Sequence, residues 1–293
     1  MVTERTSRAR IPDPPREDIH KVYLLLSPMI DAHVHVWTDD KTRYPRVANE
    51  RDYQPARFTP EDLFAHSKPA GVSRVVLIQM SFYRFDNSYM LDMMKKFPKV
   101  FAGVAVVDSK SAGVAGVMKD LRKQGVRGFR VLAGTGLDSD VMWKAGAENG
   151  QAMCALVGPE SLPVIDRMCA KFPETTVVID HLARIGATGE VRDADVRLLC
   201  GLAKHKRVHV KASAFYALGK KEAPYRDLAP LIQRVFEDYG PRRIMWASDC
   251  PFQVEGGHTY AASVGLVKDG LPFLRKEDKE WLLGKTAEQV FWR

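Results

Sequence analysis

The chain has 293 residues, 45% of them hydrophobic, so it is long enough to bury a large core. Its cysteines are scattered without a CxxC pair, which argues against a disulfide framework or a structural zinc knuckle and fits a reducing compartment. No apolar run approaches the ~20 residues of a membrane span, and the N-terminus lacks the apolar stretch of a signal peptide. We therefore expect a cytoplasmic protein with no membrane partner.

The formal net charge of +8 favours an anionic ligand. Lysines and arginines are interleaved with acidic residues along the helix-like segments instead of gathering in one run. A nucleic-acid surface needs such clustering, so we expect no nucleic-acid partner and a small anionic molecule as the substrate. The sequence leaves the oligomeric state open and is compatible with a homodimer.

Residues 1–28 are predicted to form an irregular N-terminal arm, because they are rich in proline and charge and show no hydrophobic period. From residue 29 onward, short apolar runs alternate with amphipathic runs of helical period. Thr59 and Ser139 are typical N-terminal caps for two of the predicted helices. The predicted strands cover residues 29–36, 74–80, 101–107, 126–132, 152–157, 176–181, 207–213 and 243–249. The predicted helices cover residues 60–70, 86–97, 111–124, 139–149, 159–171, 191–205, 225–239 and 276–290.

Eight strands, each followed by a helix, are the number needed to close a barrel. An open, doubly wound sheet carries a glycine-rich phosphate loop after its first strand, whereas the first strand here ends in His-Val-His-Val-Trp. We therefore predict an α/β protein in which residues 29–293 form a (β/α)8 barrel without an internal domain boundary. Such barrels carry their chemistry at the carboxyl ends of the strands, so functional side chains are expected there.

The first predicted strand carries Asp31, His33 and His35 at alternating positions. Strict alternation would point these three toward the barrel interior and would point Ile30 and Ala32 toward the helices. The two imidazoles would then lie about 7 Å apart along the strand and could bind one divalent metal ion from one side. A hydrogen-bonded pair of buried histidines is the alternative, but burying two imidazoles and a carboxylate without a task is costly.

Two further strand ends carry candidate residues. The sixth strand ends in Asp180-His181, and if Ile179 and His181 face inward, His181 meets the two histidines of the first strand. The eighth strand ends at Asp249, because Pro251 stops it. A carboxylate there can ligate a metal ion and can take a proton from a bound water, although a turn or helix-cap role is also open.

Basic residues on two other strands are expected to point into the same mouth. The fourth strand would point Arg130 inward, where a guanidinium suits a substrate carboxylate. The seventh strand would point Lys211 inward, where it could pair with Asp31 or Asp249 or bind substrate. A purely structural ion pair is an equally open role for this lysine. Three residues that follow the second and sixth strands are further candidates for substrate binding, namely Gln79, Tyr83 and Arg184.

Three segments carry a resemblance to a known family. Residues 31–35 (Asp-Ala-His-Val-His), 179–182 (Ile-Asp-His-Leu) and 247–251 (Ala-Ser-Asp-Cys-Pro) resemble motifs of the amidohydrolase-related family, often called amidohydrolase 2. Residues 284–291 are similar to the final helix of that family. The family belongs to the metal-dependent hydrolase superfamily of TIM barrels and includes sugar-acid lactonases, sulfomuconolactonase, pyrone-dicarboxylate lactonase and several decarboxylases. The resemblance extends over nearly the whole chain, from residue 29 to residue 292.

The resemblance implies a lactonase-like hydrolase with at most one divalent metal ion, Zn²⁺ being the expected one. His33, His35, His181 and Asp249 would hold that ion, and Asp249 and His181 would take part in catalysis. Arg130 matches a basic position that some lactonase members use near a substrate carboxylate. A two-metal centre is not expected, because the fifth strand carries no bridging histidine or lysine. Some relatives with similar residues work without metal, so direct polarisation of the carbonyl by the histidines stays open.

Together these residues predict hydrolysis of a small lactone or ester. Water would attack the carbonyl, Asp249 would accept the proton, and the histidines would hold the metal or stabilise the oxyanion. The alternative is a non-oxidative decarboxylase of a small aromatic or unsaturated carboxylic acid, in which Asp249 protonates carbon. A binding protein without activity is disfavoured, because the set of candidate ligands is complete.

Overall fold

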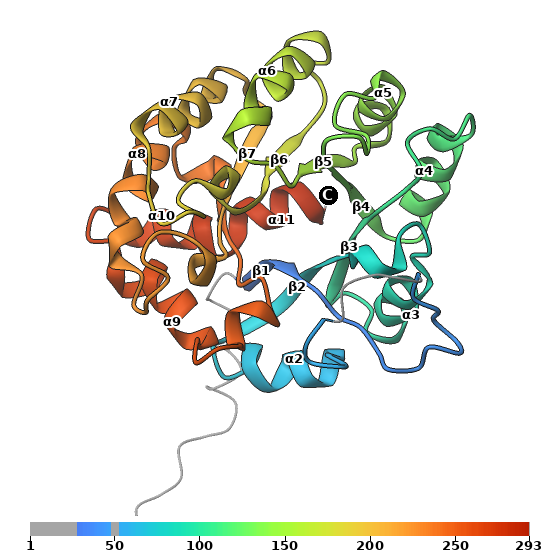
Figure 1. The fold of residues 1–293 in the computed structure, drawn as a ribbon, viewed down its shortest axis with the longest axis horizontal. Coiled ribbons are helices and arrows are strands. Elements are labelled where there is room, and N and C mark those ends of the chain that lie inside the picture. Colours follow the sequence, from blue (N-terminus) through green and yellow to red (C-terminus); the bar gives the residue numbers. More distant parts are fainter. Residues whose placement is uncertain (1–27, 48–52, 293) are drawn as a thin grey trace, which may run out of the picture.

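The strands form one eight-stranded parallel sheet in which the neighbours follow chain order from β1 to β8 (Figure 1). The computed structural model describes residues 28–47 and 53–292, so the predicted N-terminal arm lies outside the described residues except for Pro28. The strands are β1 Met29–Val34, β2 Val72–Ile78, β3 Phe101–Ala105, β4 Val126–Val131, β5 Ala152–Ala155, β6 Val177–Ile179, β7 Val208–Ala212 and β8 Ile244–Trp246.

The first strand and the segment after the last strand close the sheet into a barrel. A parallel bridge joins Val34 to Cys250. The backbone N–H of Asp249 donates a 2.9 Å hydrogen bond to the carbonyl of His33, and the N–H of His35 donates one of 2.8 Å to the carbonyl of Cys250. The predicted (β/α)8 barrel is therefore confirmed, with β1 and β8 meeting near their carboxyl ends.

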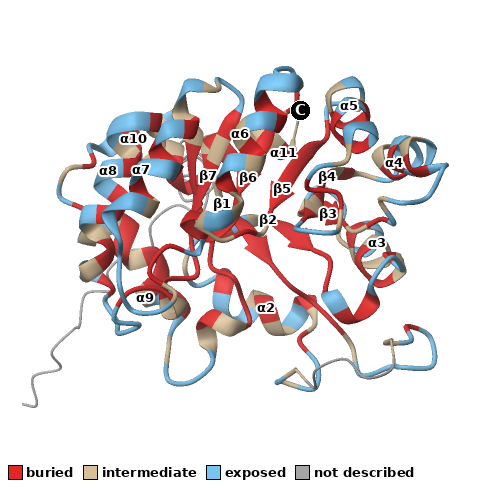
Figure 2. Ribbon diagram, turned by 45° about the horizontal axis from the view of Figure 1, so that its top comes forward, coloured by how far each residue is buried: buried red, intermediate tan, exposed pale blue. Residues whose placement is uncertain are grey.

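Helices alternate with the strands and cover the outside of the barrel, with their exposed faces outward (Figure 2). Thr59 caps the first of them by accepting a hydrogen bond from the N–H of Asp62, and Ser139 caps the helix that begins at Asp140. The helices are α2 Pro60–Ser67, α3 Ser88–Lys96, α4 Val114–Lys123, α5 Asp140–Asn149, α6 Leu162–Lys171, α7 Asp193–Gly201, α8 Ala229–Tyr239, α9 Tyr260–Gly265, α10 Lys276–Glu280 and α11 Thr286–Phe291. Among the described residues, no helix has both the length and the apolar character needed to cross a membrane.

The last helix closes the end of the barrel at which the strands begin. Phe291 of α11 is 1% exposed and shares an apolar cluster with Ile30 of β1, Val76 of β2 and Met245 of β8. Helix α11 contacts β1, β4 and β8, and Figure 1 shows it lying across the ring of strands. The end of the barrel at which the strands begin is therefore filled mainly by apolar side chains.

Side chains do not alternate strictly along β1. Its pairing with β2 shifts register between Asp31 and Val34. Ala32 belongs to the interior cluster, whereas Asp31 accepts a hydrogen bond from Tyr260 of α9 on the helix side. His33 then faces the interior again. The expectation that Asp31 faces inward with the histidines is wrong, because the register shift turns both Ala32 and His33 toward the interior.

Side chains of β4 and β7 point in the directions that alternation predicts, whereas those of β6 point in the opposite directions. Phe129 of β4 and Val210 of β7 pack in the cluster between strands and helices, so Arg130 and Lys211 point inward. In β6 it is Ile179 that packs in this outer cluster, and Asp180 points inward. The alternation proposed for His181 is therefore wrong, and this histidine reaches the barrel mouth by a different route.

Candidate active site

A cavity of about 960 Å³ opens at the carboxyl end of the barrel. Candidate residues from the first, second, fourth, sixth and eighth strand ends line it, namely His35, Gln79, Arg130, His181, Arg184 and Asp249. His33 lies directly beneath this lining and is fully buried. The position agrees with the general rule that barrel enzymes carry their chemistry at the carboxyl ends of the strands.

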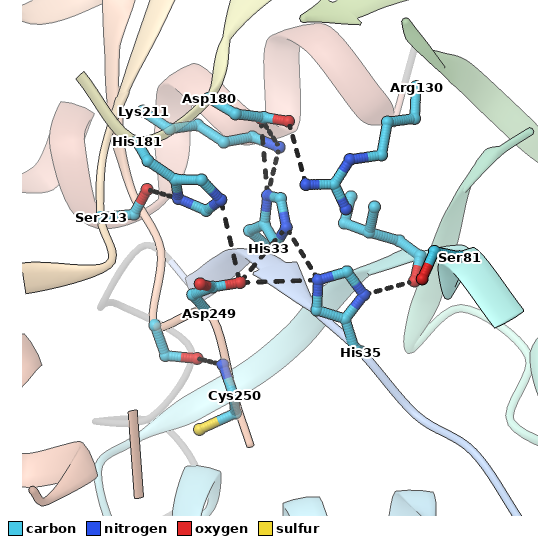
Figure 3. Close-up of polar contacts among 12 residues, drawn as sticks. His33, His35, Ser81, Arg130, Asp180, His181, Lys211, Ser213, Asp249 and Cys250 are labelled. Carbon is cyan, nitrogen blue, oxygen red and sulfur yellow. Dashed lines mark hydrogen bonds and ion pairs between the residues drawn. The ribbon is translucent and has the colours of Figure 1, made fainter. Parts of the chain in front are cut away.

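Three imidazole nitrogens face one carboxylate oxygen (Figure 3). Oδ1 of Asp249 lies 3.4 Å from Nε2 of His33, 3.5 Å from Nε2 of His35 and 3.9 Å from Nε2 of His181. The Nε2 atoms of His33 and His35 are 3.2 Å apart. The structure thus brings together the four residues that the sequence singled out as metal ligands.

His181 enters this cluster through an unusual backbone turn. Its φ is 52°, and Leu182, Ala183 and Arg184 also have positive φ, so the chain turns left-handed directly after β6. This turn points His181 into the mouth although the preceding residue faces the interior as well. Nδ1 of His181 lies 2.8 Å from Oγ of Ser213, which fixes the orientation of the ring.

Backbone strain concentrates around the cavity. Ten non-glycine residues in the described part of the chain have positive φ, and six of these ten line the cavity. The six are Arg84, His181, Arg184, Ala214, Lys221 and Asp249. Such conformations cost about 1–3 kcal/mol each and persist where the surrounding structure holds them, which is typical of functional sites.

An ion pair lies beneath the imidazoles. Nζ of Lys211 is 2.9 Å from Oδ1 of Asp180 and 3.2 Å from Nδ1 of His33. Both charged side chains are 0% exposed. The structural ion pair expected for Lys211 is therefore found, but its partner is Asp180 of the sixth strand end and not Asp31 or Asp249. Lys211 does not line the cavity, so the expected contact with substrate is not found.

Asp180 is the main residue that sequence reasoning missed in the interior. Strict alternation points its neighbour His181 inward in its place, so the strand pattern does not indicate Asp180. The available signal was an acidic residue at the end of a strand whose other residues, Val177–Ile179, are all apolar. Nη2 of Arg130 lies 4.0 Å from the second oxygen of this carboxylate, so Asp180 faces cationic groups of β4 and β7.

The two carboxylates are held ionised. Burial opposes ionisation of Asp180, but Lys211 and His33 outweigh it and hold its pKa well below the usual range. Burial also opposes ionisation of Asp249, but the polar imidazole groups that surround it hold its pKa below the usual range. At neutral pH both side chains therefore carry a negative charge.

Two of the imidazoles are held neutral. Burial, followed by the positive charge of Lys211, lowers the pKa of His33 well below its usual value. Burial likewise lowers the pKa of His181. Neutral imidazoles keep a nitrogen lone pair, which a metal ion or a proton donor can use.

The donor set fits one divalent cation. His33, His181 and Asp249 each offer one ligand atom, and these atoms lie within 4.8 Å of one another at buried positions. Nδ1 of His35 is 2.9 Å from the carbonyl of Ile78, which can only accept, so the proton of this ring lies on Nδ1. Nε2 of His35 therefore turns a lone pair toward Oδ1 of Asp249. Acceptors that face one another in this way need a cation or a proton between them.

The remaining predicted residues differ in position. Arg130 and Arg184 line the cavity, as does Gln79, whose side-chain amide donates to the carbonyl of Asp86. Tyr83 does not line it: its hydroxyl accepts from the N–H of Thr38, and its side chain is 3% exposed. The prediction of Tyr83 as a substrate-binding residue is wrong, because the short helix Ser81–Tyr83 turns it away from the cavity.

Tyr216 is a second residue that the sequence did not suggest. Its hydroxyl donates a 2.7 Å hydrogen bond to Oδ2 of Asp249, and the residue lines the cavity. It lies in the short helix Phe215–Ala217 after β7. No periodicity extends into this loop, so the strand pattern carries no signal for it.

Comparisons with known proteins agree with this geometry. Residues 30–293 match a family model described as amidohydrolase. An L-fucono-1,5-lactonase of Burkholderia ambifaria is 28% identical over 249 residues, which cover 78% of this chain and 82% of the relative. A 2-pyrone-4,6-dicarboxylate hydrolase of Comamonas testosteroni is 28% identical over 281 residues, which cover 90% of each chain.

A solved structure shares the fold. It is a probable 2-pyrone-4,6-dicarboxylic acid hydrolase of Acinetobacter baumannii with citric acid bound, and it superposes with a TM-score of 0.76 at 23% identity. The match covers 90% of this chain and 99% of that one. With the barrel, the strand-end cluster and a family model that spans all but the first residues, the chain belongs to the amidohydrolase family and is an enzyme of the hydrolase class.

Proposed function

We propose that the enzyme hydrolyses a lactone or ester that carries an anionic group. The observation that carries this proposal is the position of Asp249, whose Oδ1 lies within 3.9 Å of three imidazole nitrogens at the floor of a cavity lined by arginines. The lactonase relatives support the choice of substrate class.

Asp249 acts as the general base. It is ionised, it faces the cavity, and its Oδ2 is occupied by the Tyr216 hydroxyl, so Oδ1 receives the proton of the attacking water. The water attacks the carbonyl carbon, and the ring C–O bond breaks when the proton is returned to the leaving oxygen. His181 lines the cavity beside Asp249, and in the alternative without metal its Nε2–H would stabilise the developing oxyanion.

A single Zn²⁺ is the proposed cofactor, with His33, His35, His181 and Asp249 as the residues that would hold it. Bound there, such an ion would lower the pKa of water from 15.7 to about 7 and would polarise the carbonyl. Ser213 and the carbonyl of Ile78 orient two of these rings through their Nδ1 atoms, which is how outer hydrogen bonds commonly fix histidine ligands.

Arg130 and Arg184 bind the anionic group of the substrate. The Arg130 guanidinium is 11% exposed at the cavity wall, and its Nε lacks a hydrogen-bond partner among the described residues. A carboxylate or sulfonate that accepts from the exposed part of this guanidinium would form charge-assisted hydrogen bonds with it. The free, buried cysteines Cys154, Cys169, Cys200 and Cys250 support our proposal that the enzyme works in the cytoplasm.

The test is turnover of a panel of aldonolactones and carboxylated lactones by the wild type and by Asp249→Asn. We expect hydrolysis by the wild type and a loss of at least a thousandfold in the variant, with full activity in Asp120→Asn, a surface change on α4. Unchanged hydrolysis by Asp249→Asn would exclude the proposed base. Release of CO₂ from aromatic acids, without lactone hydrolysis, would instead favour a decarboxylase.

A further inference from the structure

The cavity has a polar floor and an outer wall that is apolar in part. The floor carries His35, His181, Asp249 and Arg130. The wall carries charged residues, among them Arg84, Lys221 and Glu255, and several large apolar side chains from the loops that follow the strands, namely Met80, Phe85, Leu132, Leu156, Leu218 and Phe252. A lactone of minimal size, held by the floor, would leave most of this wall in contact with water.

Two residues of the wall are unusually exposed for their type. Phe85, after β2, is 47% exposed, and Leu132, after β4, is 37% exposed. Large apolar side chains that stay exposed beside a binding site commonly take part in binding. Both belong to the lining of the same cavity as Asp249, so they can meet a ligand that is bound to the floor.

A second hollow adjoins the first at Phe85. It has a volume of about 420 Å³ and lies against α3 and α4. Phe85 lines both hollows, and the apolar residues of the second are Leu91, Val107, Val114, Val117 and Leu121. The apolar surface therefore runs from the active-site wall past Phe85 and onto the flank of the barrel.

The size of the cavity agrees with a larger ligand. About 960 Å³ is near the upper end of the roughly 300–1,000 Å³ that encloses drug-sized molecules. Arg130, beside Asp180, supplies a cationic group to the lining, whereas Phe85 and Leu132 supply exposed apolar side chains. A ligand that satisfies both parts has an anionic end and an apolar end.

We propose that the natural substrate is amphipathic: a lactone or ester whose anionic group lies at Arg130 and whose extended alkyl or aryl arm lies over Phe85 and Leu132. This inference rests on the proposed function, because the reacting carbonyl is placed at Asp249. It goes further in naming an apolar arm and the side chains that select it.

The test is a series of carboxylated γ-lactones with alkyl arms of increasing length. Burial of each added methylene is expected to raise kcat/KM of the wild type about two- to fourfold until the wall is covered. The Phe85→Ser and Leu132→Ser variants should reduce the ratio of long-arm to short-arm kcat/KM about tenfold. Val141→Ser is the matched control, since Val141 is 53% exposed on α5 and does not line the cavity.

Binding of the ring-opened hydroxy acids, measured by calorimetry, separates this inference from the proposed function. If affinity rises with arm length in the wild type and not in Phe85→Ser, the apolar arm of the ligand is supported. This holds even if no lactone is hydrolysed, and that second result would show that the proposed hydrolytic function is wrong. The inference is overturned if hydrolysis and binding are both independent of arm length. It is also overturned if both depend on arm length equally in the wild type and in all variants. Either result leaves the hydrolytic function intact.

Discussion

The hydroxyl of Tyr216 donates a 2.7 Å hydrogen bond to Oδ2 of Asp249, and the two oxygens of that carboxylate thereby have different surroundings. Oδ2 is held by the tyrosine, while Oδ1 faces the imidazoles of His33, His35 and His181. Burial and the charge of Asp249 raise the pKa of Tyr216, so the tyrosine remains a donor. It is therefore a positioning residue for the proposed base.

Removal of this donor is expected to slow catalysis with little effect on substrate binding. In Tyr216→Phe we expect kcat to fall about ten- to a hundredfold, the usual range for losing a hydrogen bond to a charged group, while KM changes little. Steady-state kinetics on the best lactone of the panel provide the measurement. Tyr44→Phe is the control, because its hydroxyl makes a similar hydrogen bond to Asp92 outside the cavity. Equal effects of the two variants would contradict the positioning role.

The buried pair of Lys211 and Asp180 is expected to matter for stability more than for binding. Lys211→Met leaves a fully buried carboxylate without its main partner, which should lower the free energy of unfolding by about 3–5 kcal/mol. The double variant Lys211→Met/Asp180→Asn removes that charge and should recover much of the loss. Urea unfolding followed by circular dichroism measures both. A double variant as unstable as the single one would show that the charge of Asp180 is not the cause.

The proposed zinc site makes a prediction about Ser213. If Nε2 of His181 binds the ion, Nδ1 carries the ring proton, and this N–H donates a hydrogen bond to Oγ of Ser213. Ser213→Ala should then weaken zinc binding about 10- to 100-fold, and His33→Ala should abolish the single bound equivalent. Competition titration with a chromophoric chelator and elemental analysis provide the measurements. Ser73→Ala, at the start of β2, is expected to bind zinc like the wild type. Full activity of a preparation without metal would leave direct polarisation by the histidines as the mechanism.

Asp31 gives the fold a predicted dependence on pH. Burial raises the pKa of this carboxyl to about 6, in spite of hydrogen bonds from Ser248 and Tyr260. The folded protein thus binds this proton more tightly than the unfolded chain does. The contribution of the protonated Asp31 carboxyl to the free energy of unfolding is therefore complete below about pH 4, and it is lost as the pH rises through 6. The loss is about 3 kcal/mol for a shift of about two units.

The Asp31→Asn variant isolates this effect, because the other titrating groups are common to both proteins. Between pH 4 and 7, the free energy of unfolding of the wild type should fall relative to that of the variant by about this amount. Urea unfolding at intervals of half a pH unit gives the two curves. Parallel curves would mean that Asp31 ionises in the folded protein as it does in water.

The sequence was sufficient to predict the barrel and much of the active site. The eightfold alternation and the strand ends located His33, His35, Asp249 and Arg130, because side-chain chemistry at a strand end depends mainly on local pattern. The failures have specific causes. Asp31 was assigned to the wrong face because a register shift depends on the pairing with β2, which the sequence of one strand does not contain.

The interior ion pair and the loop residues of the site could not be predicted from hydrophobic periodicity. Asp180 and Lys211 lie on different strands, and only the closed barrel brings them within 2.9 Å. His181 was expected in the site for a wrong reason, since its left-handed backbone, and not alternation, turns it inward. Tyr216 lies in a loop whose conformation depends on tertiary packing, so no local signal points to it.

The position of α11 has a consequence for how the protein is made. Phe291 fills the base of the barrel against Ile30, a residue of the first strand. During synthesis on the ribosome, the apolar interior therefore stays open until the segment Thr286–Phe291 has left the exit tunnel. Strands that have already emerged expose their inner faces for that whole interval, and slow non-local closure of this kind increases the risk of aggregation. The nascent barrel is thus expected to depend on chaperones until the segment of α11 has emerged.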